Sequence, residues 1–533
     1  MGNIILKGKS PTILMDSSLH TQSFGGVNAV NTLIIATEII KEFLDSGKYD
    51  FRITSQNKGY INYSAQYCET HYNYLARLAE SYGEQFYYDG EVLHFGELPI
   101  PEKPIELIYA ENVNNIKVKL KTYFIKPEFY AYNSSSHKKF SGYNKEIRHR
   151  GELAQNVYKI NQEIHKSRGL THAPFNPNNF LDVDFSQRSA AGSAAVEVFT
   201  VTGTCTIPFL YPGCVTDLYM RRNNTDHTSY FTRLMITKTW HEVDAKGHYK
   251  GRFEAIAEGT GFLPKPDFTV PTVGVQTATV ISNTDPLDQG RIQVRFDWQP
   301  ADSCTYFIRV MSPDAGGTGV FPQNRGFVAV PEIGDQVMVG FEYNHPDFPF
   351  AMGGMFHGKI AVGGGEGNHI KSIQTRSGNR IIFDDHQGSL FVADASGNSY
   401  LMDGKGNIEI KAPGNITFTA GSNVQFNITG SMAVNTTQQL SITVPTLQHV
   451  TTSLEIRTAK ISFVASESFK IESKDTNIVG TKKLLLHSDE NAVVNSKGKL
   501  GLKASRETYK PTSQKLINKL KRKKQIPKVL NQQ

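Results

Sequence analysis

Apolar and polar residues alternate in a short pattern that recurs along residues 403–502. Five successive apolar-polar-apolar triplets share a spacing of eight residues, and they begin at Ile408, Ile416, Val424, Met432 and Leu440. Such alternation is typical of a half-buried strand, and the Gly, Asn, Ser and Thr residues between the triplets favour turns. The pattern predicts a β-repeat array, in which neighbouring repeats stack to bury a core.

The length of the repeat indicates how the array is assembled. Eight residues accommodate one strand of about four residues and one corner, which cannot close a prism from one chain. Three chains that supply one face each can close it. We therefore expect an intertwined trimeric β-helix, on the order of 60 Å long for about twelve repeats stacked about 4.8 Å apart. The alternatives are a monomeric solenoid and an ordinary β-sandwich, and the register is least regular after residue 444.

Helical periodicity appears twice near the N-terminus. Residues 31–44 are expected to form a helix that ends by Gly47, with an apolar side made of Leu33, Ile34, Ile40, Phe43 and Leu44. Residues 65–82 are expected to form a second helix, which Gly83 ends. His71 lies on its apolar face, and we interpret it as a packed core histidine rather than a ligand.

Strand signals surround these helices. Asp89-Gly90 predicts a hairpin of residues 85–88 and 92–95. Further strands are expected at residues 4–6, 116–124, 196–202, 231–240 and 249–256. The last two are joined by the turn Asp244-Ala245-Lys246-Gly247. Residues 125–195 are polar, and we expect them to form a long excursion with little core of its own.

The segment after residue 265 indicates a small barrel. Prolines hold a linker at residues 266–272 extended. Beyond it, strands are expected at residues 276–281, 291–296, 306–310, 327–330, 336–341 and 351–354. Five or six short strands with glycine turns at residues 288–290 and 332–335 suit a closed barrel such as an OB-fold.

The barrel sequence resembles a known family. The motifs that carry the resemblance are Asp288-Gln289-Gly290-Arg291-Ile292, Val330-Pro331-Glu332-Ile333-Gly334-Asp335 and His345-Pro346-Asp347-Phe348-Pro349. They look like the OB barrel of VgrG, the trimeric spike protein of type VI secretion systems, which is related to the hub and spike of contractile phage tails. Residues 66–88 and 236–256 resemble the family's hub, and residues 373–385 resemble its neck.

The resemblance covers most of residues 10–500, with the motifs in the family's order. Ser10-Pro11-Thr12-Ile13-Leu14 and Tyr87-Tyr88-Asp89-Gly90 suggest the Bacteroidetes-type branch. Family members begin upstream of residue 1, so part of the first hub barrel is expected to be absent.

The expected fold is mainly β and multidomain. It comprises a phage-hub-like α+β domain over residues 1–265, the linker over 266–272, an OB-fold barrel over 273–357, a neck over 358–402, an intertwined trimeric β-helix spike over 403–502 and a basic C-terminal tail over 503–533.

Charge and cysteine content narrow the class of protein. The net charge of +7 equals the seven Lys and Arg residues of positions 511–533, which hold no acidic residue, so the remainder is neutral and nucleic-acid binding is not indicated. Residues 515–524 are either a solvated end, which we favour, or a basic amphipathic helix that docks a tip protein, an effector or a membrane. Cys68, Cys205, Cys214 and Cys304 lack zinc-site spacing and are expected to be free buried thiols, as in a reducing cytoplasm.

Candidate catalytic groups are few. The 45 or so residues between the barrel and the repeats are too few for a hydrolase domain. Asp384-Asp385 would point to opposite faces of a strand and are interpreted as the start of a turn. Glu366 and His369 flank a flexible glycine junction, and the loop of Gly316, Gly317 and Gly319 lacks the Gly-Lys-Ser/Thr of a phosphate cradle. We therefore expect no catalytic, cofactor-binding or metal site, no cofactor, and no enzyme activity.

The resemblance implies a structural spike that caps the tube of a contractile secretion apparatus, crosses a target membrane mechanically and delivers effectors. Implied partners are two further copies of the chain, the tube protein and baseplate at the hub end, and a PAAR-type tip protein or an effector at the spike end. No apolar run reaches the length of a membrane span, and the N-terminal apolar stretch is too short for a signal peptide. Assembly in the cytoplasm and export through the apparatus are therefore expected. The alternative is a tailspike-like glycan-degrading or adhesive β-helix protein of a phage-derived particle.

Overall fold

The computed structural model describes residues 9–503 and 508–509, except 101–102, 179 and 222–226. The strand predicted at residues 4–6 and the basic helix considered for the tail lie outside the described residues. The chain divides into two compact units, Met1–Thr417 and Phe418–Gln533. The expected mainly β, multidomain fold is confirmed, with strands in most elements and α-helices confined, among described residues, to the first unit.

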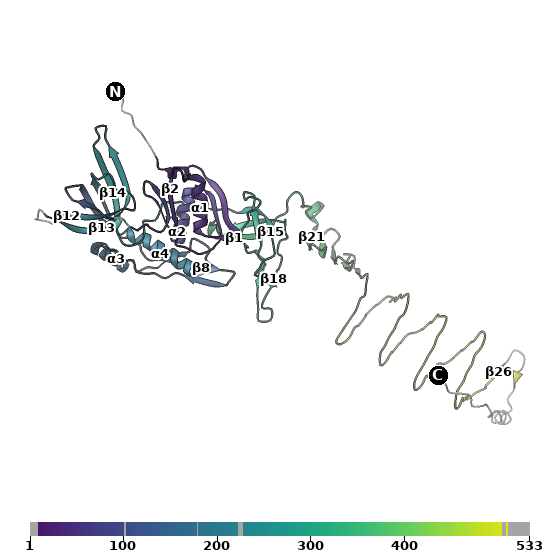
Figure 1. Ribbon diagram of the computed structural model, residues 1–533. Coiled ribbons are helices and arrows are strands. Elements are labelled where there is room, and N and C mark those ends of the chain that lie inside the picture. Colours follow the sequence, from purple (N-terminus) through teal and green to yellow (C-terminus); the bar gives the residue numbers. More distant parts are fainter. Residues whose placement is uncertain (1–8, 101–102, 179, 222–226, 504–507, 510–533) are drawn as a thin grey trace, which may run out of the picture. The chain divides into compact units, whose positions relative to one another are not determined.

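The N-terminal part of the first unit packs two helices against short sheets (Figure 1). After η1 (Pro11–Leu14), β1 (His20–Val30) pairs antiparallel with β3 (Ile61–Glu69), and β2 (Asp50–Thr54), β5 (Val92–Gly96) and β4 (Gln85–Tyr88) form a second sheet. Helix α1 (Thr32–Phe43) begins at its cap Asn31, whose side chain accepts a hydrogen bond from the N–H of Ile34. The predicted hairpin on Asp89-Gly90 is confirmed.

Two details of the predicted helices are wrong. Residues 65–69 belong to β3, so α2 (His71–Tyr82) begins later than expected, capped by Thr70 and ended by Gly83 at φ 79°. The buried side of α1 is formed by Ile35, Ala36, Ile39 and Ile40, whereas Leu33 and Ile34 are 43% and 40% exposed. Apolar residues at positions 33–36 allow two different faces, and contact with α2 selects one of them.

A six-stranded sheet lies in the segment predicted as a hub domain (residues 1–265), which is called the hub below. Its order is β6 (Ile105–Ile108), β12 (Val215–Arg221), β13 (Thr228–Val243), β14 (Tyr249–Ala257), β11 (Phe199–Cys205) and β7 (Val113–Leu120). The long β13–β14 hairpin turns where the sequence predicted, since the N–H groups of Lys246 and His248 donate to the Asp244 side chain.

The prediction that residues 125–195 have little core of their own is wrong. They form β8 (Pro127–Asn133), β9 (Lys138–Ser141), α3 (Glu152–Ile164), β10 (Gly169–His172) and α4 (Phe180–Val196). Tyr158 and Phe175 are 2% and 1% exposed. The buried side of α4 includes Ser186 and Gln187, so its sequence carries no apolar stripe from which a packed helix could be recognised.

The barrel segment is built on a four-stranded sheet. Its order is β16 (Gln293–Phe296), β15 (Gln276–Ser282), β19 (Gln336–Phe341) and β20 (Pro349–Gly354). In the chain, the short helix η2 (Glu342–Asn344) follows β19. The strands predicted at residues 306–310 and 327–330 are absent from the described structure, where 306–310 makes only isolated bridges. A two-residue hairpin of β17 (Ala315–Gly316) and β18 (Arg325–Gly326) lies between them.

A five-stranded meander follows the barrel. After η3 (Glu366–Asn368) it runs through β21 (Ile370–Gln374), β22 (Arg380–Asp384), β23 (Ser389–Ala393), β24 (Ser399–Met402) and β25 (Ile408–Lys411). Similar turns join three of the strand pairs, with main-chain bonds from Thr375 to Asn379, from Asp394 to Asn398 and from Asp403 to Asn407. The first repeat triplet is thus the last strand of this sheet.

Residues 418–501 of the second unit form straight runs separated by bends, seen as the yellow-green zigzag of Figure 1. Bends fall at Gly421-Ser422, Thr429-Gly430 and Thr437-Gln438, eight residues apart. Between residues 412 and 501, all of which are described, the runs have no strand partner within the chain. The last described residues form the short pair β26 (Leu502–Lys503) and β27 (Thr508–Tyr509). The trimeric β-helix stays a prediction, because its partner strands would come from other chains.

Candidate functional site

A buried ion network joins helix α2 of the hub to the end of the barrel. Arg77 Nη2 donates to Glu69 Oε1 at 2.7 Å, and Arg77 Nη1 lies 3.9 Å from Asp347 Oδ2. All three side chains are at most 4% exposed. Burial by itself lowers the pKa of Arg77, but the carboxylates of Glu69 and Asp347 have the larger effect, so the pKa lies above its ordinary value. Charges buried in this way are costly unless each is paired, so the network favours one placement of barrel on hub.

Asp347 connects the barrel to the main chain of β3. Its carboxylate accepts hydrogen bonds from the N–H of Ala65 at 2.7 Å and from the hydroxyl of Ser64 at 3.3 Å. The Ser64 hydroxyl also accepts a hydrogen bond from Tyr74 of α2 at 2.9 Å. Burial raises the pKa of Asp347, and Arg77 opposes this shift. One aspartate therefore contacts the strand and the helix of the hub together.

Two histidines complete this junction. His172 of β10 stacks on Tyr343 with ring centroids 3.9 Å apart, and its ring meets Phe348 edge-on. The ring of His345 also meets Phe348 edge-on, with ring centroids 5.3 Å apart. Burial lowers the pKa of both imidazoles, that of His345 to about 3, with Arg77 and His172 adding to the effect. The hub and barrel therefore pack through neutral histidines.

Stability should fall in acid because of His345. Its pKa is about 3 when folded and about 6.5 when unfolded, so only the unfolded chain binds this proton between those values. The free energy of unfolding is therefore undiminished by His345 above pH 6.5. It should decrease as the pH falls, by about 2–3 kcal/mol at pH 4.5.

Unfolding midpoints measured between pH 8 and 4.5 would test this. His345→Asn keeps an acceptor for the N–H of Asp347 and should show a shallower loss in acid. The control His248→Asn changes a side chain that is 76% exposed and should follow the native profile. An unchanged acid profile in His345→Asn would contradict the assignment.

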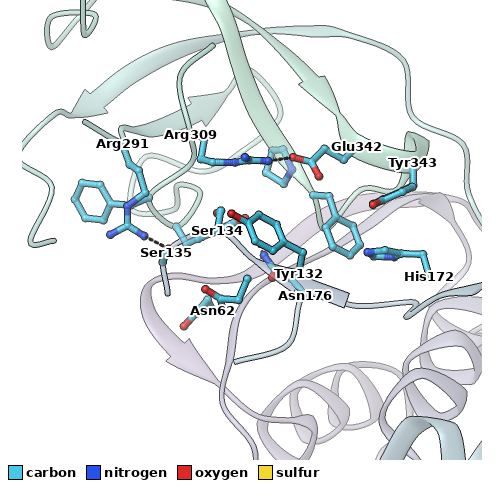
Figure 2. Close-up of a pocket in the computed structure, with 15 residues that line it drawn as sticks. Asn62, Tyr132, Ser134, Ser135, His172, Asn176, Arg291, Arg309, Glu342 and Tyr343 are labelled. Atoms are coloured by element: carbon cyan, nitrogen blue, oxygen red, sulfur yellow. Dashed lines mark hydrogen bonds and ion pairs between the residues drawn. The ribbon is translucent and has the colours of Figure 1, made fainter. Parts of the chain in front are cut away.

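A cavity of about 90 Å³ lies at the same boundary (Figure 2). Arg291 is held by Asp285 through bonds of 2.9 and 2.6 Å and donates to the Ser135 hydroxyl at 2.8 Å. Arg309 pairs with Glu342 on the barrel side, as the dashed line shows. A carboxylate of the barrel segment engages each arginine, and the bond from Arg291 to Ser135 links the barrel to the hub.

The residues considered as catalytic from the sequence lie outside this junction, and two of them meet through the main chain, since the N–H of Asp385 donates to the carbonyl oxygen of His369 at 3.0 Å. Asp384 Oδ1 accepts hydrogen bonds from the N–H groups of His386 and Gln387, so it begins a turn as predicted. Asp385 instead lies 3.7 Å from Lys371. Glu366 is the exposed first residue of η3, and His369, which follows η3, is half-buried.

The glycine loop, His71 and the cysteines, which the sequence also drew attention to, lie in ordinary structural environments. Gly316 and Gly317 belong to the β17–β18 hairpin, with Gly319 nearer its tip. His71 is buried against Phe43, and burial lowers its pKa to about 4, as expected for a core histidine. Three cysteines are buried free thiols as expected, whereas Cys68 is exposed.

The described residues contain neither a metal-ligating cluster nor a membrane-crossing helix. No group of three or more potential metal-ligating side chains occurs among them. In the same residues, no helix has the length and apolar character needed to cross a membrane.

The junction residues carry no pattern that predicts them as a site. Asp347 stands in a barrel motif, Arg77 falls within the hub-like residues 66–88, and His172 lies in the segment that was expected to lack a core. One signal was available, because Arg77 interrupts the apolar face of α2 between Tyr74 and Leu78, where a charge requires a buried partner.

The repeats of the second unit present a different kind of candidate site. Their apolar side chains are exposed in the single chain, for example Val424 at 54%, Phe426 at 64% and Leu440 at 61%. Exposed apolar surface of this extent marks an association surface. Its main-chain groups also lack strand partners within the chain, which favours pairing with further strands.

Comparison with known proteins identifies the barrel. Residues 276–356 match the family described as the type VI secretion system/phage-baseplate injector OB domain. The chain is 30% identical over 168 residues to the type VI secretion system spike protein VgrG5 of Pseudomonas aeruginosa, covering 26% of this chain and 20% of that protein. It is 31% identical over 123 residues to VgrG1c of the same organism, covering 21% and 16%. The chain thus matches about a fifth of the length of these curated relatives.

Solved structures that the comparison returns include the E. coli c3393 protein, a type VI secretion component described as similar to the phage T4 tail proteins gp27 and gp5. It shares 16% identity with a TM-score of 0.39, over 65% of this chain and 76% of that one. The lidless Francisella PdpA-VgrG complex contains a chain with 10% identity and a TM-score of 0.46, over 75% and 78%. The predicted resemblance to VgrG spike proteins is confirmed. The Bacteroidetes-type branch stays a prediction.

Proposed function

We propose that this chain, which carries the injector OB domain of type VI spike proteins, is the structural spike of a contractile secretion apparatus. Three copies would wind residues 403–502 into one β-helix that projects from the hub. The hub would meet the tube protein and baseplate, and the spike end would carry a PAAR-type tip protein or an effector. Assembly would take place in the cytoplasm, followed by export through the apparatus.

The exposed apolar residues of the repeats are the observation that carries this proposal. A single chain leaves Val424, Phe426 and their counterparts in water. Three chains would bury one set from each chain in every layer, with about 1.5–3 kcal/mol gained for each fully buried side chain. A closed prism would also pair nearly every main-chain group and leave no long lateral edge. Such a prism is stiff and must unfold in all three chains together.

The junction of hub and barrel supports the same role. A spike that is driven by a contracting sheath must pass force from hub to barrel without hinging. Arg77, Asp347 and the His172–Tyr343 stack hold that boundary with buried contacts rather than with a flexible linker. The segment predicted as a linker is itself bound to the hub, since Asn73 exchanges hydrogen bonds of 2.7 and 2.8 Å with Thr269. We propose that the chain acts mechanically and not as an enzyme.

Deleting residues 403–502 is expected to abolish secretion of the tube protein, because the apparatus would assemble without its point. The measurement is the amount of tube protein in the culture medium against the amount inside the cells. Deleting residues 503–533 is the matched control for a change at the same end of the chain and should leave secretion above that of the first deletion. Normal secretion by the mutant that lacks residues 403–502 would refute the puncturing role.

A further inference from the structure

One side of the five-stranded meander (residues 370–411) carries two rows of apolar side chains, here called the apolar face. Cross-strand pairing forms the first row from Ile373, Ile381, Val392, Tyr400 and Ile410. Residues two apart on a strand share a face, so the second row consists of Phe383, Leu390, Met402 and Ile408. Much of this face is open to solvent, with Ile373 exposed to 55% and Ile408 to 61%.

Charge lies on the other side of the meander or at its border. On the opposite face, the guanidinium of Arg380 lies over the ring of Phe391, 5.4 Å from its centroid, and Lys411 pairs with Glu409 at 3.0 Å. Lys371 stands at the border of the apolar face and pairs with Asp385 at 3.7 Å. An open apolar surface of this extent marks an association surface, and this one offers no charge for a charged partner.

The apolar face continues into the repeats. Ile408 and Ile410 belong to it, and they are also the two apolar residues of the first repeat triplet. In the proposed spike, the apolar residues of each triplet turn towards the other two chains. The occupant that fits the apolar face is therefore the same face of two further copies of this chain.

The repeats by themselves align three chains only weakly. Their triplets recur every eight residues, so a chain that slips by one repeat still places apolar residues against apolar residues. Only the layers at the two ends would lose partners. The strands of the meander follow another spacing, because they begin at residues 370, 380, 389, 399 and 408, nine or ten residues apart. Its apolar face also combines side chains of different sizes, so a displaced copy would not match it.

The meander can form before chains meet. Each of its strands pairs with the next strand of the same chain, whereas residues 412–501 have no strand partner within the chain. Contacts between residues close in sequence form faster than distant ones. Three or more strands with a hydrophobic face can be stable when that face is packed. A preformed sheet whose apolar face awaits a partner would therefore precede the winding of the repeats.

We propose that the meander sets the register of the spike, because three copies associate through their apolar faces and so start the repeats of all three chains in the same layer. The inference rests on the proposed spike, which supplies the three chains. It gives the predicted neck (residues 358–402) a role in assembly. Without this element the repeats would still associate, but in more than one alignment.

Distances between spin labels test the register in the full-length protein. Cys68→Ser removes the exposed thiol, and Ser441→Cys then gives each chain one accessible site for a nitroxide, on the outward side of a triplet. Chains in register carry their three labels in one layer, so pulsed electron paramagnetic resonance should show a single distance. A chain displaced by one repeat would carry its label in another layer and would add a longer distance.

A matched pair of variants in this labelled protein tests the cause. Val392→Asp places a carboxylate on the apolar face, and Ala393→Asp places one on the opposite face of the same strand. Val392→Asp should add longer distances or lower the particle mass towards that of one chain, and Ala393→Asp should do neither. Val392→Ser removes apolar surface without adding charge and should change the distances in the same direction, even if Val392→Asp does not fold. A single native distance at native mass in Val392→Ser would overturn the proposal, as would equal effects of Val392→Asp and Ala393→Asp.

Light scattering of the same samples separates this inference from the proposed function. A native trimer of about 178 kDa (3 × 59.3) that shows several label distances would overturn the role of the meander and leave the proposed spike intact. A monomeric native protein would overturn both.

Discussion

Replacing Arg77 by alanine is expected to lower the free energy of unfolding by about 3–5 kcal/mol, the cost of leaving buried carboxylates without their partner. Glu69 would lose its 2.7 Å bond, and Asp347 would lose its nearest cation. Since these groups join α2 and β3 to the barrel, hub and barrel should separate at lower urea concentration. Urea unfolding followed by circular dichroism measures the change.

Two further variants distinguish lost pairing from general damage. In the triple variant Arg77→Met, Glu69→Gln, Asp347→Asn the three charges are removed together, so it should be more stable than Arg77→Ala alone. Arg168→Ala removes an exposed arginine whose pair with Glu128 lies at the surface, and its unfolding midpoint should stay close to native. An equal loss of unfolding free energy in Arg77→Ala and Arg168→Ala would show that the buried network contributes little to stability.

Phe426→Asp is expected to prevent the repeats from associating. In the proposed trimer this change removes three phenylalanines from one layer, a loss of about 5–9 kcal/mol (3 × 1.5–3). It also places three carboxylates of like charge in the interior, where burial without a partner adds a further cost. The particle mass should therefore fall from about 178 kDa towards the 59.3 kDa of one chain. Light scattering after size-exclusion chromatography measures it.

Gln425→Asp is the matched control for this change. It introduces the same carboxylate one position earlier, on the side of the triplet that faces outward, and the trimer should persist. The pair tests the register as well as the assembly, because a shift of one residue would exchange the two results. If Gln425→Asp dissociated the trimer and Phe426→Asp did not, the side that carries Gln425 would face inward and the predicted register would be wrong. A native protein of monomer mass would contradict the trimer itself.

Much of the local structure could be predicted from the sequence. Asn31 and Thr70 cap helices, Gly83 ends one, and Asp89-Gly90 and Asp244 form hairpin turns. Each of these signals acts through bonds between residues a few positions apart, so it does not depend on the rest of the fold. The motifs of the barrel were sufficient to recognise the family, and comparison with known proteins confirmed that resemblance.

The errors arose where a pattern fits two structures. Residues 65–69 have apolar positions that suit the helix that follows, but pairing with β1 makes them part of β3. Helix α4 buries Ser186 and Gln187, so a polar sequence concealed a packed element. In the barrel, residues 306–310 contribute single bridges where the alternation predicted a strand.

The candidate sites, too, could be predicted from the sequence only where they depend on local pattern. The sequence predicted the repeat period, and the bends of the structure follow it. It did not predict the junction of Arg77, Asp347 and His172, whose members come from α2, the end of the barrel and β10. Only a three-dimensional arrangement brings those segments together.

By itself, therefore, the sequence determined the repeat of eight residues, the alternation that separates an apolar from a polar side, and the turns at either end of each run. These features depend on the two-residue period of a strand and on the backbone preferences of single residues. Only the tertiary structure decided which charges are buried together and which polar helix is part of a core. Ser64 and Asp347 are 283 positions apart, and their contact depends on how whole elements pack, because burial changes the free energy of a charge according to its neighbours in space and not in sequence.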